Sequence, residues 1–121
     1  MSFVFRNRML NLNIAGNEFE IEIDAKNNEI MARLGPQAID TAKAYQEGEK
    51  TEDKAINDFK GYINEALYDD GAFDKIFKSR TPDLRDCMDI LTYIANEIGD
   101  FNQKNALATK KDQKVIPMPL N

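Results

Sequence analysis

A long amphipathic helix predicted over residues 82–101 constrains the fold of this chain more than any other stretch. From Leu84 onward, apolar residues recur every three or four positions, which places them on one face of a helix. Thr81 suits the N-cap, and Pro82 suits the first helical position because it lacks an N–H that would be unpaired there. This helix must bury its apolar stripe against other elements. The stripe comprises Leu84, Cys87, Met88, Leu91, Ile94, Ala95, Ile98 and Phe101.

Residues 10–14 and 19–23 predict a β-hairpin, because apolar and polar side chains alternate strictly on both arms. Between the arms lies Ala15-Gly16-Asn17-Glu18, which contains a Gly-Asn turn signal. An isolated two-stranded hairpin is only marginally stable. We therefore expect its apolar face to lie on the helices or on a third strand, for which residues 2–6 are a candidate.

The remaining periodic segments predict further helices. Helical spacing begins near Asn27, and Gly35-Pro36 is expected to interrupt it before a second piece that ends near Gly48. Thr51 is the predicted N-cap of the next helix, and residues 72–78 predict one or two helical turns.

These elements together predict a single α+β domain over residues 1–102. In it, the N-terminal hairpin packs on a bundle of three to four α-helices. Residues 103–121 lack a sustained period and are expected to form a mobile C-terminal tail.

Composition narrows the class of protein. The chain has 121 residues, of which 42% are hydrophobic and 31% charged, and this suits one globular domain. No apolar stretch is long enough to span a bilayer and no secretory signal opens the chain, so we expect a cytoplasmic protein that does not bind membranes. The net charge of −5 argues against binding to nucleic acid. The single cysteine, Cys87, lies on the apolar stripe and is expected to be buried.

The sequence offers no pattern that is typical of an enzyme. The chain lacks histidine, the commonest general base and metal ligand. Asp69, Asp70 and Asp74 surround Gly71, but Arg80 stands where a calcium loop needs a bidentate glutamate. We find no phosphate-binding glycine loop and no nucleophile motif. We therefore expect no catalytic, metal or cofactor site.

Four segments of the chain carry a resemblance to a known family. They are Glu65-Ala66-Leu67, residues 71–77, Arg80-Thr81-Pro82 and residues 89–94. These segments resemble small tail assembly chaperones of siphophages and prophages of Gram-positive bacteria. The resemblance implies a non-catalytic, often self-associating factor that coats the long helical tape measure protein and recruits subunits of the major tail protein. It also implies a homo-oligomer that acts in the cytoplasm of the bacterial host.

Two other functions remain open at this point. One is an acidic adaptor or inhibitor that binds a basic host or phage protein. The other is a structural tail component that stays in the virion.

Three groups of apolar residues are candidates for binding a partner. The first two are the Phe3, Val4 and Phe5 cluster and Phe73, which we expect on a short exposed turn. The third is the apolar patch of the tail, with Val115, Ile116 and Met118. Extended segments that contain proline bind partners at little ordering cost, which suits this patch to docking.

Overall fold

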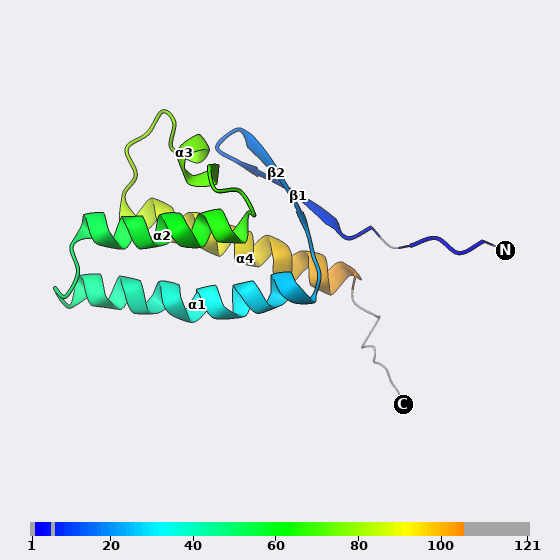
Figure 1. Ribbon diagram of the computed structural model, residues 1–121, viewed down its shortest axis with the longest axis horizontal. Coiled ribbons are helices and arrows are strands. Elements are labelled where there is room, and N and C mark those ends of the chain that lie inside the picture. Colours follow the sequence, from blue (N-terminus) through cyan, green and yellow to red (C-terminus); the bar gives the residue numbers. More distant parts are fainter. Residues whose placement is uncertain (1, 6, 106–121) are drawn as a thin grey trace.

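An N-terminal hairpin packs on a bundle of helices in the computed structural model, which describes residues 2–5 and 7–105 (Figure 1). The predicted α+β class is therefore confirmed. In chain order the elements are β1 (Met9–Ile14), β2 (Asn17–Glu22), α1 (Ala25–Gln46), α2 (Glu52–Ala66), α3 (Ala72–Ile76) and α4 (Leu84–Asn105).

The hairpin has the predicted alternation and a tight two-residue turn. Leu12 pairs with Phe19, and both side chains are buried. The turn residues are Ala15 and Gly16, with φ of 53° and 82°. Two consecutive positive φ values are typical of a type I′ turn, whose twist matches that of the flanking strands. The turn therefore lies one residue earlier than the Gly-Asn pair suggested.

The prediction that residues 2–6 form a third strand is wrong for residues 2–5. Residues 2–5 form no strand, and the sheet in the described part of the chain has only β1 and β2. Residue 6 lies outside the described residues.

Helix α1 is continuous, so the predicted break at Gly35-Pro36 is wrong. Pro36 lies inside the helix, although it has no N–H for the carbonyl of Ala32. Packing on α2 holds the helix on both sides of the proline: Leu34 is fully buried, and the hydroxyls of Thr41 and Tyr62 are hydrogen-bonded at 2.8 Å. Tertiary contacts therefore outweigh the local penalty.

Helix α4 begins later than predicted. Its first residue is Leu84, and the carboxylate of Asp83 accepts a hydrogen bond from the backbone N–H of Asp86 at 2.7 Å. Asp83 thus has the capping role that we assigned to Thr81, two residues further along. The cap predicted for α2 is confirmed, since the Thr51 hydroxyl accepts a hydrogen bond from the N–H of Lys54.

The far end of α4 also differs from the prediction. The helix continues through Asn105, three residues into the predicted tail, and residues 106–121 lie outside the described part.

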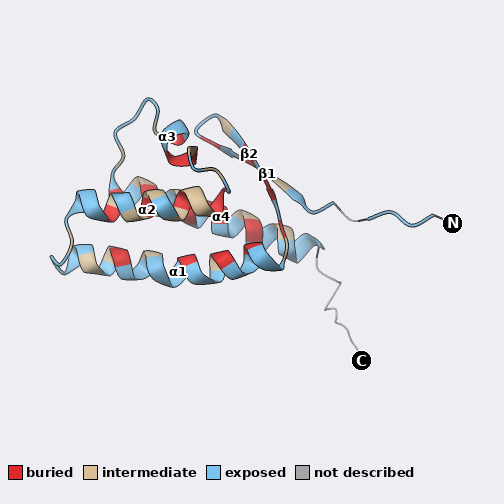
Figure 2. Ribbon diagram, in the orientation of Figure 1, coloured by how far each residue is buried: buried red, intermediate tan, exposed pale blue. Residues whose placement is uncertain are grey.

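The core forms where the hairpin and the helices meet, and buried residues occur on every element (Figure 2). Cys87 is completely buried there, as predicted. Burial raises the pKa of its thiol to about 12, with a smaller contribution from the nearby carboxylates of Asp86 and Asp83. The thiol therefore stays protonated and unreactive at neutral pH.

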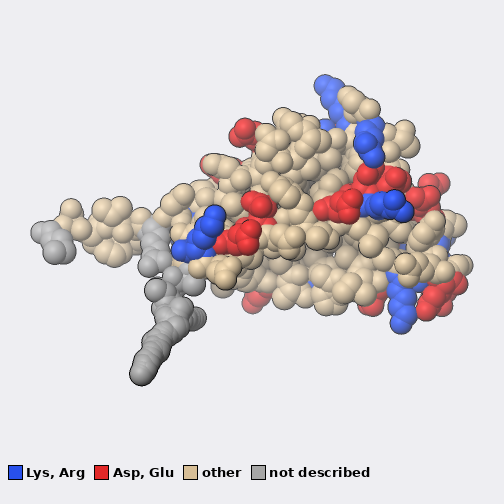
Figure 3. Space-filling view, turned by 180° about the vertical axis from the view of Figure 1, so that it is seen from behind, with Lys and Arg blue, Asp and Glu red and all other residues tan. Residues whose placement is uncertain are grey.

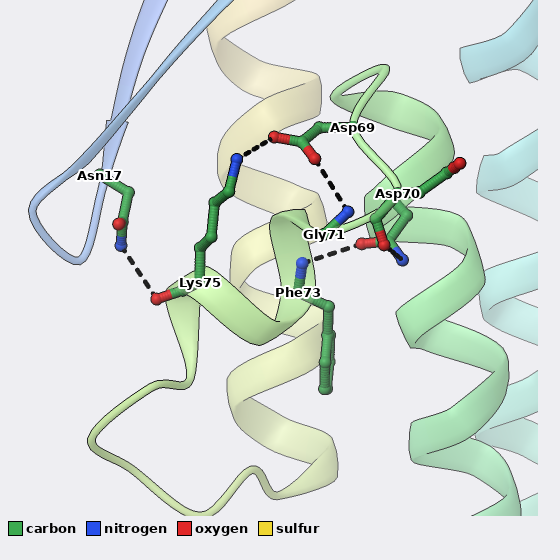
Figure 4. Close-up of polar contacts among 7 residues, drawn as sticks. Asn17, Asp69, Asp70, Gly71, Phe73 and Lys75 are labelled. Atoms are coloured by element: carbon green, nitrogen blue, oxygen red, sulfur yellow. Dashed lines mark hydrogen bonds and ion pairs between the residues drawn. The ribbon is translucent and has the colours of Figure 1, made fainter.

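Side-chain hydrogen bonds fix α3 between α2 and the hairpin (Figure 4). The amide of Asn64 accepts from the N–H of Phe73 and donates to the carbonyl of Asp70. From the hairpin, the amide of Asn17 donates to the carbonyl of Lys75 at 3.2 Å. The loop before α3 is thus tied to α2, and α3 itself is tied to the hairpin.

The carboxylate of Asp69 is expected to stabilise the protein at neutral pH and to lose this contribution in acid. Its carboxylate accepts hydrogen bonds from the ammonium of Lys75 at 2.7 Å and from the N–H of Gly71 at 2.8 Å, and these lower its pKa, Lys75 the most. A lowered pKa in the folded state means that the carboxylate stabilises the fold above its unfolded-state pKa of about 3.9 and stops doing so as pH falls below it. We expect the free energy of unfolding, measured in urea, to fall less steeply between about pH 5 and pH 2 in Asp69→Asn than in the wild type.

Asp70→Asn is the matched control for this experiment, because Asp70 contributes its main-chain carbonyl to the contacts that hold α3. It should keep the wild-type dependence on pH. Equal slopes for Asp69→Asn and the wild type would contradict the role of Asp69.

Candidate docking groove

An apolar groove separates α1 from α4. Both helices pack along α2, but they make few contacts with each other. In Figure 1, α1 lies beside α2 and α4 lies behind α2. The side chains of Asn28 and Asn102 are hydrogen-bonded at 3.2 Å, which joins the start of α1 to the end of α4 and makes the two helices antiparallel. The space between them has a volume of about 730 Å³.

The groove is lined mainly by apolar side chains. Phe59 of α2, which is almost fully buried, forms part of the floor together with Leu91. Removing such a surface from water is favourable, so the groove suits an apolar partner. The lining residues are Met31, Gly35, Ala38, Ile39, Ala42, Lys43, Gln46, Glu47, Phe59, Met88, Leu91, Thr92, Ala95 and Ile98.

Small residues line the α1 wall of the groove. Gly35, Ala38 and Ala42 lie three and four residues apart, so they share one face of the helix. A Cβ added to Gly35 would meet no atom within 4 Å, so the space above this residue is open. Small side chains let a second backbone approach to about 8 Å between helix axes.

Larger apolar side chains stand exposed on the rim. Ile39 of α1 is 68% exposed and Met88 of α4 is 41% exposed. Burying an isoleucine side chain fully contributes about 1.5–3 kcal/mol. A partner that covers the rim would therefore gain binding free energy. This part of the molecule is therefore the candidate docking site.

One end of the groove is acidic. There it opens into a second depression, of about 540 Å³, with which it shares Ala42, Gln46 and Met88. The second depression is lined by three carboxylate residues, Glu52, Asp83 and Asp89, and by one cation, Arg85.

One of these carboxylates is already engaged, since Glu52 accepts a hydrogen bond from the N–H of Leu84 at 3.3 Å. Figure 3 shows that charged side chains gather in patches on one face and leave wide areas uncharged. A partner that combines an apolar face with a basic end would complement this groove.

The predicted partner-binding residues do not meet in the groove. Phe3, Val4 and Phe5 are at least 78% exposed, as expected, and belong to an arm that leads away from the helices (Figure 1). The exposure predicted for Phe73 is wrong: its side chain is 6% exposed, because α3 turns it into the core beside Phe77.

The third group of predicted residues, Val115, Ile116 and Met118, lies outside the described residues.

Sequence reasoning missed the groove because a groove is a gap between two helices, and a periodicity pattern reports only which face of one helix is apolar. Ile39 lies at helical spacing from Ala42, so periodicity alone places it on the apolar face of its helix, yet it is mostly exposed. The one usable signal was the spacing of Gly35, Ala38 and Ala42, which gives one face of the helix only small side chains.

The described residues show neither a metal site nor a membrane span. Across residues 2–5 and 7–105, no group of three or more His, Cys, Asp and Glu side chains is placed to hold a metal ion. Within the same ranges, no helix combines the length and apolarity that crossing a bilayer requires. Comparison of the chain with protein-family models, with curated proteins and with solved structures found no significant match.

Proposed function

We propose that this protein is a siphophage tail assembly chaperone that holds an amphipathic helix of the tape measure protein in the groove between α1 and α4. The observation that carries the proposal is the open apolar groove with Ile39 and Met88 exposed on its rim. The resemblance of residues 65–67, 71–77, 80–82 and 89–94 to this family names the partner.

A helix suits this groove better than an extended strand does. The walls are helices, whose backbone groups are already hydrogen-bonded, so they have little to offer the free N–H and C=O groups of a strand. A helix satisfies its own backbone groups and can enter with an apolar face alone. Along α4, the groove extends from Met88 to Ile98, about 15 Å at 1.5 Å per residue. That length accommodates almost three turns of a bound helix.

The exposed arm gives the chaperone a second surface. Phe3, Val4 and Phe5 lie on the surface, and the rings of Phe3 and Phe5 contact each other edge to face, 4.8 Å apart. We assign to this arm the recruitment of the major tail protein or of further copies of this chain. In this proposal the protein is non-catalytic, acts in the cytoplasm of the host and forms homo-oligomers on the tape measure protein.

Co-expression with the tape measure protein of the same phage tests the proposal. We expect the two proteins to purify together, and we expect Ile39→Asp to weaken the complex at least about tenfold, because a carboxylate then replaces an isoleucine at the contact. Isothermal titration with the isolated complex components measures the loss. Ile39 is 68% exposed, so the substitution should leave the fold intact.

Tyr93→Asp is the matched control. Tyr93 is also an exposed apolar residue of the bundle, at 37%, but it does not line the groove. The Tyr93→Asp variant should bind the tape measure protein as the wild type does. If Val4→Asp abolishes binding while Ile39→Asp has no effect, the arm and not the groove is the docking site.

The other two functions predict different results. An acidic adaptor would bind a basic protein and ignore the tape measure protein. A structural tail component would be found by mass spectrometry in purified virions, where a chaperone should be absent.

A further inference from the structure

The chain leaves the described structure at one mouth of the groove. Helix α4 ends at Asn105, and its last turns are hydrogen-bonded to the first turn of α1 through Asn102 and Asn28. Met31 and Ile98 line the groove at this same end. Sixteen more residues, 106–121, follow Asn105.

Those residues are long enough to return into the groove. By the rise of a helix, Asn105 lies about 10 Å beyond Ile98 and about 25 Å beyond Met88. The apolar segment 115–120 starts ten residues after Asn105. Ten residues span up to about 33 Å when fully extended. Every part of the groove is therefore within reach of the segment.

The composition of segment 115–120 suits a wall made of helices. The segment reads Val-Ile-Pro-Met-Pro-Leu, so four of its residues are apolar and two are prolines. A proline has no N–H that would be left unpaired against a wall with few free acceptors. Prolines also favour a polyproline II conformation with a rise of about 3.1 Å, in which six residues span about 19 Å. This length is close to that of the groove.

Charge favours the return of the tail as well. Residues 106–121 hold three lysines and one aspartate. The rest of the chain holds 13 Lys and Arg against 20 Asp and Glu, a net charge of −7. A basic segment tethered to an acidic body is attracted over about one Debye length, roughly 8 Å at physiological salt.

We propose that residues 115–120 dock into the groove between α1 and α4 of their own chain and cover the exposed rim residues Ile39 and Met88. The tail and a partner helix then compete for one surface, and the free chain protects its apolar groove from unspecific contacts. The inference goes beyond the proposed function and does not depend on the tape measure protein being the partner.

Paramagnetic relaxation in the full-length chain tests the docking without any partner. A nitroxide attached to Asn121→Cys labels the tail alone, because Cys87 is fully buried and unreactive. An effective concentration of about 1 mM fills the groove in half or more of the molecules if the segment binds with a Kd of about 1 mM or less. We expect the amide signals of Ala42 and Ala95 to lose about half of their intensity, whereas those of Asn11 and Glu20 in the hairpin change little.

A second variant keeps the test decisive. Ile116→Asp combined with Met118→Asp lies outside the described fold and should restore the groove signals to full intensity. Equal losses in groove and hairpin, or a loss that persists in this double variant, would overturn the proposal.

A mixing experiment separates the chain's own tail from that of a second copy. Isotope-labelled chains without the nitroxide are mixed with nitroxide-labelled chains that carry no isotope. Unchanged groove signals in the mixture support docking within one chain. Signal loss in the mixture assigns the occupant to another copy and overturns the proposal as stated.

Discussion

Phe59→Ala is expected to lower the free energy of unfolding by about 3–5 kcal/mol, the range for truncating a buried phenylalanine. Phe59 is 1% exposed and lies on α2, the helix on which both α1 and α4 pack. Its ring also contacts Tyr62 edge to face, 5.4 Å away, and Tyr62 holds α1 through the hydroxyl of Thr41. The substitution therefore leaves a cavity and loosens the contact between α1 and α2.

Urea unfolding followed by circular dichroism measures this loss. Domains of this size have a total stability of about 5–15 kcal/mol, so the variant should lose at least about a fifth of it. Phe5→Ala is the matched control, because the same ring is removed from a position that is 84% exposed. It should change stability by less than about 0.5 kcal/mol. A loss below about 1 kcal/mol for Phe59→Ala would contradict its place in the core.

The elements of this fold that the sequence predicts well are those where one strong local pattern determines the structure. The alternation on residues 10–14 and 19–23 has only one buried face, so it sets the register of the hairpin. Thr51 caps α2 because its hydroxyl is placed before a continuous apolar stripe. At α4 two capping residues compete, and the carboxylate of Asp83 prevails over the hydroxyl of Thr81.

The features that the sequence does not predict depend on contacts between distant residues. Phe73 is buried because Asn64, nine residues earlier, holds the backbone of α3 against α2. The groove exists because α1 and α4 both pack on α2 and make few contacts with each other. The periodicity of one helix does not report how far that helix lies from another. Reasoning from one segment at a time therefore finds the helices and misses the candidate site between them.

Pro36→Ala is expected to raise the free energy of unfolding by about 1–3 kcal/mol. A proline inside a helix costs about 3 kcal/mol relative to alanine, because it removes one hydrogen bond and its ring clashes with the preceding turn. Alanine restores an N–H that can reach the carbonyl of Ala32. Part of the gain is offset, since losing the proline gives the unfolded chain more freedom, worth about 0.4–1 kcal/mol. Residue 36 is exposed, so the smaller side chain leaves no cavity in the core.

Pro82→Ala separates the two contributions. Pro82 precedes the first residue of α4, so its substitution frees the unfolded chain without repairing a helix. It should therefore lower stability by up to about 1 kcal/mol, and the difference between the two variants in urea gives the helical part alone. If Pro36→Ala destabilises the protein instead, the proline itself shapes α1 in a way that the fold requires. Because Gly35 and Ala38 flank the proline on the groove wall, that result would make the shape of α1 at Pro36 a requirement of the groove. The binding of a partner helix that we propose for the groove should then weaken in the same variant.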